Sequence, residues 1–337
     1  MKTVLLQCIL CVALLVACED HRLGEPIWQP ISSPFDTFRK EVPSFGIGSK
    51  AYFGLGFGSN NTIGANTFYK DFWEYDTSTK VWRKLADFPG SNRAGATSFA
   101  INGKGYIGFG YSLICPPVEG LCSFVTYRDI WEYNPGNDSW KKVVDADEPA
   151  FIDTRYGKAV SLNGEIYIEI NGTFFAFNPV TYSLTKRASN PLSITSNGLF
   201  AIRNKAYSLI SLVNLNGGEF CAVSEYDPQT DTWIRKKDFP GLSRRLFTAF
   251  SLNGYGYCGG GGRFDNKGTY SIYTYLKDFW KYDPTNDQWT RIEDYPGKGS
   301  QFVSSVALAD KALLGFGEGL EESRVRIFQD FWLFQPK

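Results

Sequence analysis

The chain has 337 residues, and its 35 basic and 35 acidic side chains leave no net charge. This balance, without a basic stripe along the sequence, argues against a nucleic-acid-binding protein. The only histidine is His21, near the N-terminus, so the rest of the chain lacks the imidazole ligands that a copper site needs.

The first 26 residues have the pattern of an export and anchoring segment. Residues 1–17 carry one lysine and then an apolar run too short to span a membrane, which predicts a secretory signal peptide. Leu15-Val16-Ala17-Cys18 resembles the lipobox of bacterial lipoproteins, which implies that Cys18 is lipidated and that residues 18–26 form a tether to the membrane. We therefore expect an outer-membrane lipoprotein of the bacterial envelope, on its periplasmic or surface side; an ordinary signal peptide with an incidental cysteine is the alternative.

A unit of about twenty residues recurs roughly every fifty residues through the remaining chain. Its copies begin at Asp71, Asp129, Val223 and Asp278. Each copy has an alternating apolar run, a polar turn and a second run that contains a tryptophan, a pattern that predicts strand, turn and strand. Further pairs of apolar runs lie between the copies, around Asn-Gly dipeptides that favour hairpins, at Asn102-Gly103, Asn163-Gly164 and Asn253-Gly254.

This four-strand unit resembles the kelch repeat, through its glycine-rich second strand, the Tyr-Asp end of its third strand and the Trp of its fourth. The resemblance implies a β-propeller. Third-strand copies predict six blades, at Asp71–Asp76, Asp129–Asn134, Phe174–Asn178, Val223–Asp227, Asp278–Asp283 and Asp330–Phe334. The third copy is degenerate, because Leu184 stands near where the tryptophan is expected. The predicted fold class is all-β, a six-bladed kelch-type propeller over residues 27–337.

The final copy stops before a fourth strand could form. Ile27–Phe35 has the tryptophan, the polar alternation and the terminal proline of the other fourth strands. We therefore expect this N-terminal segment to complete the C-terminal blade and close the ring, leaving no unpaired sheet edge. The repeated aromatic rings should pack between blades, and the propeller should be monomeric.

Four cysteines lie beyond Cys18. Cys115 and Cys122 bracket a short loop, and an oxidising compartment favours a disulfide between them. Cys221 and Cys258 lie in different blades and are expected to be buried free thiols.

One side of the propeller should carry the function, because its loops between second and third strands are long. These loops are Ser59–Lys70, Ser112–Arg128, Ser211–Ala222, Gly262–Lys277 and Glu318–Gln329. Arginines precede the inner strands on the same side and could surround the mouth of the axial channel, at Arg39, Arg93, Arg155, Arg244 and Arg245. Kelch propellers that bind acidic peptides or sugars use arginines at similar positions, so the resemblance implies an anionic ligand.

Arg263 and Tyr273 lie in the long loops and complete the predicted ligand-binding set. The alternative is a structural role for these residues. The arginines would then bond backbone carbonyls, or pair with Asp87, Asp153 and Asp238, and the loop aromatics would bury one another.

Two functions remain open from the sequence. The first is a non-catalytic binding module for a glycan, an acidic peptide or a protein partner. The second is a mutarotase or epimerase acting on an acidic sugar such as sialic acid, since enzymes of that class are similar six-bladed kelch proteins; no catalytic residue can be named. We expect no cofactor: a galactose-oxidase-like copper site would need histidines, and the aspartate boxes of sialidases are absent.

Overall fold

The computed structural model describes residues 27–59, 67–114, 122–145, 154–170, 172–192, 198–266 and 271–336. The expected signal peptide, the lipidation site Cys18 and the tether lie outside these ranges, as does Cys115. Within the described ranges the chain forms strands and turns but no helix, and hence no helix that could cross a membrane.

In the part of the chain that the structure describes, six four-stranded antiparallel sheets form the body of the molecule, each running from an inner to an outer strand. The first is β3 (Ser44–Ile47), β4 (Lys50–Gly54), β7 (Phe72–Asp76) and β8 (Val81–Leu85). The second is β9 (Thr97–Ile101), β10 (Lys104–Gly108), β13 (Asp129–Asn134) and β14 (Ser139–Asp145). The third is β15 (Lys158–Leu162), β16 (Glu165–Ile170), β17 (Thr173–Phe177) and β18 (Leu184–Arg187).

The other three sheets follow the same order. The fourth is β19 (Gly198–Ile202), β20 (Lys205–Val213), β21 (Glu219–Asp227) and β22 (Thr232–Phe239). The fifth is β23 (Thr248–Leu252), β24 (Tyr255–Gly259), β27 (Phe279–Asp283) and β28 (Gln288–Ile292). The sixth is β29 (Ser304–Ala307), β30 (Ala312–Gly315), β33 (Phe331–Phe334) and β1 (Trp28–Ile31).

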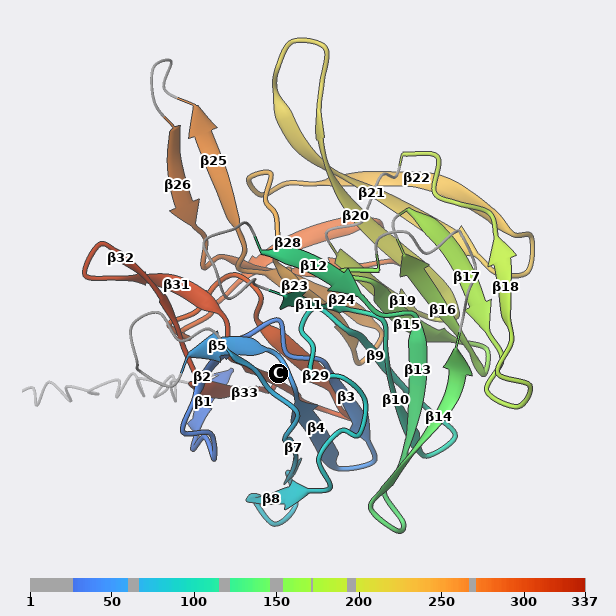
Figure 1. Ribbon diagram of the computed structural model, residues 1–337. Helices are drawn as coiled ribbons and strands as arrows, with labels where there is room; N and C mark the ends of the chain where they lie inside the picture. The colour runs from blue at the N-terminus through green and yellow to red at the C-terminus, as the bar shows by residue number, and fades with distance from the viewer. Residues whose placement is uncertain are drawn as a thin grey trace, which may run out of the picture.

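The inner strands form a closed circle. Each inner strand contacts the next, and β29 of the sixth sheet contacts β3 of the first. In Figure 1 the colour accordingly runs round the molecule until the red last sheet meets the blue first one. The all-β propeller expected from the repeat is confirmed, and the degenerate third copy forms a complete blade.

The N-terminal strand lies where the sequence places it. β1 pairs with β33 along its whole length, from Trp28 opposite Phe334 to Ile31 opposite Phe331. The Trp28 ring is buried, with its centre 4.7 Å from the centre of the Phe334 ring. The paired segment is shorter than Ile27–Phe35, but the Phe35 ring beyond it is also buried and lies against Phe316.

The core consists of side chains packed between neighbouring blades. Among the described residues, six buried clusters each join two blades. One example is the Phe72 ring of the first blade, which lies edge-on to Trp140 of the second at 5.0 Å between ring centres. Each buried aromatic removes about 150–250 Å² from water, so these rings supply most of the cohesion between blades.

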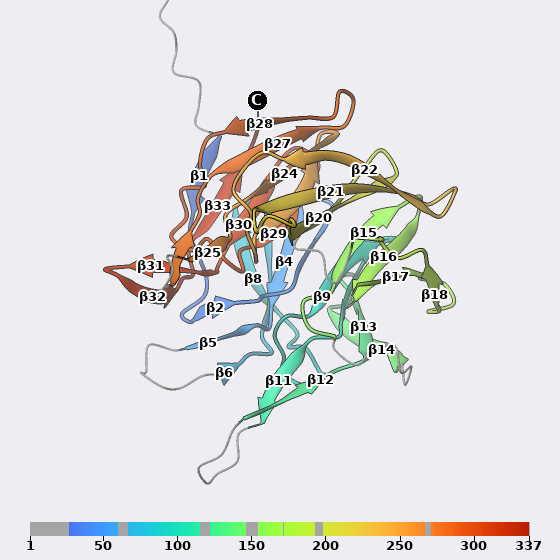
Figure 2. The ribbon, with the colours of Figure 1, turned by 90° about the horizontal axis from the view of Figure 1, so that it is seen from above.

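The two sides of the ring differ in their connections. On one, the turn side, four of the six inner hairpins close with two residues of positive φ, as at Asn102 (51°) and Gly103 (72°). Arg203 (48°) and Asn204 (61°) take the same place in the fourth blade, without the expected Asn-Gly. The long connections lie on the opposite side, which we call the hairpin side. Figure 2 shows β11–β12 and β31–β32 projecting beyond the sheets there.

These connections are not irregular loops, as the sequence suggested, but strand pairs. They comprise β2 (Phe38–Lys40), β5 (Phe57–Ser59) and β6 (Thr67–Phe68), β11 (Tyr111–Ile114) with β12 (Ser123–Thr126), β25 (Gly262–Asn266) with β26 (Ser271–Tyr275), β31 (Glu318–Glu321) with β32 (Arg324–Ile327), and extensions of β20 and β21. The alternating apolar runs in these connections are too short to be recognised as strands from the sequence. In the structure, the strand pairs satisfy backbone N–H and C=O groups on an exposed rim.

Candidate functional site

Three of the predicted arginines are part of the blade framework. Arg39, Arg93 and Arg244 are at most 2% exposed. Each forms a two-pronged ion pair with the aspartate at the start of the third strand of its own blade, namely Asp71, Asp129 and Asp278. The same aspartate accepts the indole N–H of the tryptophan two residues later. The Asp and Trp of the repeat's Asp-x-Trp pattern therefore form a buried polar cluster together with the arginine.

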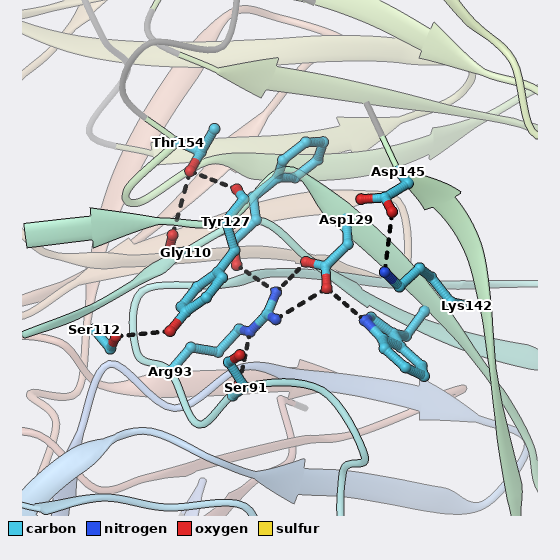
Figure 3. Close-up of polar contacts among 11 residues, drawn as sticks. Ser91, Arg93, Gly110, Ser112, Tyr127, Asp129, Lys142, Asp145 and Thr154 are labelled. Carbon is cyan, nitrogen blue, oxygen red and sulfur yellow. Dashed lines mark hydrogen bonds and ion pairs between the residues drawn. The ribbon is translucent and has the colours of Figure 1, made fainter. Parts of the chain in front are cut away.

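Figure 3 shows this cluster in the second blade. The Arg93 guanidinium lies over the Tyr127 ring, 4.1 Å from its centre, and Nη1 donates to the carbonyl of Phe109 at 3.0 Å. Nε donates to the carbonyl of Ser91 at 3.0 Å. Every nitrogen of the guanidinium is thus engaged within the blade.

This arrangement corrects the sequence-based assignment. Arg39, Arg93 and Arg244 are buried, and each uses four of its five N–H donors inside its blade, so the structural alternative describes them. Their partners are also not the aspartates expected, since Asp87 pairs with Lys84 and Asp238 with Arg235. Asp153 lies outside the described residues.

The other predicted ligand-binding residues spread over the hairpin side. Arg155 stacks on Phe124 at 4.5 Å, and Arg245 is exposed. Arg263 pairs with Asp265 at 2.7 Å. Tyr273 accepts a hydrogen bond from Gln301 and lines a groove of about 550 Å³ between β25–β26 and β31–β32. The structure gathers only part of the predicted set, because Arg245 and Arg263 line one small pocket with Arg244, whereas Arg155 and Tyr273 do not line it.

A different set of residues converges on the axis. In the five blades where it is described, the residue four positions before the centre of the inner strand has φ between 54° and 60°. These residues form what we call the mouth ring: Glu41, Gly95, Tyr156, Leu246 and Phe302. Backbone bonds link neighbours in the ring, as from Gly95 N to the carbonyl of Glu41 at 3.1 Å and from Tyr156 N to that of Gly95 at 3.0 Å. Left-handed backbone is costly for non-glycine residues, and these bonds hold it in place.

The mouth ring surrounds a cavity of about 240 Å³ on the hairpin side of the axial channel. Its lining also includes Lys158 of β15, Ser304 of β29 and Phe247 just before β23. Below it the channel continues through cavities of about 200 and 360 Å³ toward the turn side, lined mainly by small residues. The upper cavity, which we call the mouth cavity, therefore combines a concave, partly open shape with charged and aromatic groups.

Three ionisable groups in the mouth cavity are perturbed by burial, and one is the Tyr156 phenol, whose pKa desolvation raises to about 12. Desolvation raises the pKa of Glu41, although the carboxylate accepts a hydrogen bond from the Tyr111 hydroxyl at 2.7 Å, which acts in the opposite direction. Desolvation lowers the pKa of Lys158, against the opposing effect of Glu169. An acid and an amine whose pKa values both move toward neutrality are the groups expected of an acid–base pair.

The cysteines take separate places. Cys221 and Cys258 are buried free thiols. Cys122 is disulfide-bonded, while its predicted partner Cys115 lies outside the described ranges. Across the described chain, no three His, Cys, Asp or Glu side chains are grouped so that they could hold a metal ion.

Comparison with known proteins agrees with the fold. A family model described as the Kelch motif matches residues 243–294, which span most of the fifth blade. The chain is a kelch-repeat β-propeller. A solved propeller, titled "Structure of YjhT", has a TM-score of 0.68 to it at 18% identity, covering 88% of this chain and 95% of that one. At this identity the likeness shows the fold alone.

The relatives of this kelch propeller include proteins named as epimerases and proteins named as kelch-like. An N-acetylneuraminate epimerase of Vibrio cholerae is 33% identical over 97 residues, 29% of this chain and 22% of the relative. One of Pasteurella multocida is 30% identical over 209 residues, 59% of this chain and 46% of the relative. Kelch-like protein 25 of Xenopus tropicalis is 26% identical over 288 residues, 82% of this chain and 44% of the relative. The chain spans less than half the length of each of these curated relatives.

Sequence reasoning missed Glu41, Tyr156 and Lys158 as site residues. A positional signal for the first was present, because Glu41 lies two residues after Arg39 and every arginine of the framework is followed at this distance by a mouth-ring residue. In the third blade Thr154 stands at the arginine position, and its hydroxyl donates to the carbonyl of Tyr127 at 2.8 Å. Without an arginine at this position, the sequence does not show that Tyr156 and Lys158 occupy the positions that face the axis.

Proposed function

We propose that this kelch propeller binds a carbohydrate of monosaccharide size in the mouth cavity. The observation that supports it best is the lining of that cavity, in which Glu41 and Lys158 provide polar groups beside the rings of Tyr156 and Phe302. Sugars need such a combination, because their hydroxyls require hydrogen-bond partners and their C–H faces pack on aromatic rings.

A second function, interconversion of sugar anomers or epimers, is favoured by one further observation. Glu41 and Lys158 line the same cavity and have pKa values shifted toward each other. For an anomeric interconversion, the Glu41 carboxyl would donate its proton to the ring oxygen through one oxygen atom while its other oxygen accepts the proton of the anomeric hydroxyl, with Lys158 remaining an ammonium beside them. The ring then opens to a carbonyl compound, which recloses on its other face when both transfers reverse. The two epimerase relatives support this candidate.

Binding and catalysis are separated by two measurements on residues 27–337. Isothermal titration with N-acetylneuraminic acid, glucuronic acid and neutral hexoses tests binding; a saturable titration supports the proposal, and absence of heat with every sugar overturns it. Exchange NMR between the anomers of the bound sugar tests catalysis. Glu41→Gln should preserve binding but reduce exchange about 100-fold or more, the usual weight of one general acid. Exchange at the uncatalysed rate in the unaltered protein would leave binding as the function.

The place of action is proposed from the N-terminal sequence. Lipidation at Cys18 would hold the propeller at the bacterial envelope through more than one acyl chain, which gives stable anchoring. Metabolic labelling with an alkyne fatty acid should mark the full chain but not the Cys18→Ser variant. Equal labelling of both would contradict lipidation at this residue.

A further inference from the structure

Lys158 is exceptional for its position in the propeller. It lies two residues before the centre of its inner strand, whose central residue Val160 is opposite Tyr167. The same register in the other blades pairs Phe45 with Tyr52 and Phe250 with Tyr257. The residues that correspond to Lys158 in the other five blades are small or neutral: Pro43, Thr97, Gly198, Thr248 and Ser304. Packing between inner strands therefore does not require a lysine here.

The surroundings of the Lys158 ammonium are polar on one side only. Its side chain lines both the mouth cavity and the next section of the channel, and it is half-buried. Glu169 lies opposite it in the sheet and acts on it as an opposing charge, but no hydrogen bond or ion pair joins Lys158 to any described residue. A desolvated ammonium without an acceptor is unfavourable, so an anionic ligand group in the cavity would stabilise it.

The other basic groups around the mouth are already engaged or lie outside the cavity. Arg39 and Arg93 are held by Asp71 and Asp129, and Lys40 by Glu318. Glu41 is the carboxyl nearest the proposed ligand within the lining, and the burial that raises its pKa favours its uncharged form and so reduces its repulsion of an anion. Tyr156, the other titratable lining residue, is neutral as a phenol.

We propose that the ammonium of Lys158 binds the carboxylate of an acidic sugar and so makes the mouth cavity selective for acidic over neutral sugars. This inference rests on the proposed function, which requires only that a sugar binds in the cavity. It moves the anion-recognising role from the buried arginines to a single inner-strand lysine of the third blade.

The experiment compares a sugar acid with its methyl ester, which has the same ring but no charge. Titrations would use N-acetylneuraminic acid and glucuronic acid, each against its ester. The unaltered protein should bind the acid about 10- to 100-fold more tightly, the range of one charge-assisted hydrogen bond. Lys158→Met should abolish this preference while retaining the affinity for the ester, and Lys158→Arg should retain the preference.

Lys84→Met is the matched control, because Lys84 is exposed on β8 and should leave both affinities unchanged. Thermal unfolding verifies that each variant folds. Equal binding of acid and ester by the unaltered protein, or a preference that survives in Lys158→Met, overturns the role of Lys158 alone. If neither acid nor ester of either sugar binds, the proposed function fails and this inference fails with it.

Discussion

At the scale of single residues, the Arg93 side chain joins three segments of one blade. Its guanidinium bonds Asp129 at the start of the third strand, Phe109 just beyond the second and Ser91 in the crossing from the previous blade. Phe109 and Asp129 lie 16 and 36 residues from Arg93 along the chain. The arginine thus fixes the geometry of the hairpin side without facing it.

Removing Asp129 from its ion pair with Arg93 should lower the stability of the protein. Asp129→Asn leaves the Arg93 charge buried without its counter-ion, so we expect the free energy of unfolding to fall by about 3–5 kcal/mol. The control is Asp294→Asn, because the pair between Arg291 and Asp294 is exposed on both sides and should lose less than about 1 kcal/mol. Urea denaturation of both variants measures the difference. Similar small losses would show that the buried pair contributes little.

The same pairs predict how stability depends on pH. Burial alone raises the pKa of Asp71, Asp129 and Asp278, but the bonds from the arginines lower it by a larger amount. The net pKa of each therefore lies below its ordinary value of 3.8. The unfolded chain therefore binds protons more readily, and the stabilisation is present above pH 3.8 and lost as the pH falls through the lowered folded values. The gap in melting temperature between the unaltered protein and Asp129→Asn should narrow below about pH 4. A gap that stays constant down to pH 2.5 would contradict the assignment.

At the scale of the blade, the sixth sheet is built differently from the first, second and fifth. Ser300 stands at the arginine position, six residues before Val306 at the centre of the inner strand. Asp330 still accepts the Trp332 N–H at 2.8 Å, but its Oδ1 is buried without a partner. Tyr295 replaces the phenylalanine found at this place in the second and fifth blades, and its buried hydroxyl also lacks a partner. Lys277 supplies only one of the missing contacts, donating to the carbonyl of Lys298 at 3.1 Å.

Restoring the framework arginine should strengthen this blade. The double variant Ser300→Arg with Tyr295→Phe recreates the arrangement of the fifth blade and should raise the free energy of unfolding by about 1–3 kcal/mol, since a buried carboxylate oxygen gains a charged donor. Calorimetry measures the gain. In an Asp330→Asn background the gain should largely vanish, because the interaction is lost with its acceptor. A lower melting temperature of the double variant would mean that the space has closed around Ser300.

At the scale of the whole molecule, the sequence predicts the ring much better than the site. Strand alternation and the repeat of Trp and Asp are local patterns, so the blades and the pairing of β1 with β33 follow from them. Side-chain direction is not local in this sense: Arg39 and Glu41 are two residues apart and both precede an inner strand, yet the first lies inside the blade and the second faces the axis. The left-handed φ of 58° at Glu41, which separates their surroundings, has no signature in the residue type.

The closure of the ring itself is testable. The Trp28 ring packs against Phe279, Tyr295 and Phe334, with centres 4.7–5.3 Å apart, so β1 covers the edge of β33 and also contributes to the core between the fifth and sixth blades. A chain that starts at residue 32 should therefore melt at a lower temperature and associate through the exposed strand β33.

A synthetic peptide of residues 27–36 should restore both the melting temperature and the monomer, because it can pair with β33 in the register of the intact chain. The same peptide with Trp28→Ala loses the buried ring, worth about 3–5 kcal/mol, and should restore neither at equal concentration. Light scattering and thermal unfolding report the two properties. A shortened chain that stays monomeric with an unchanged melting temperature would show that the ring is held by its inner strands alone, whose contacts run from β29 to β3 without β1.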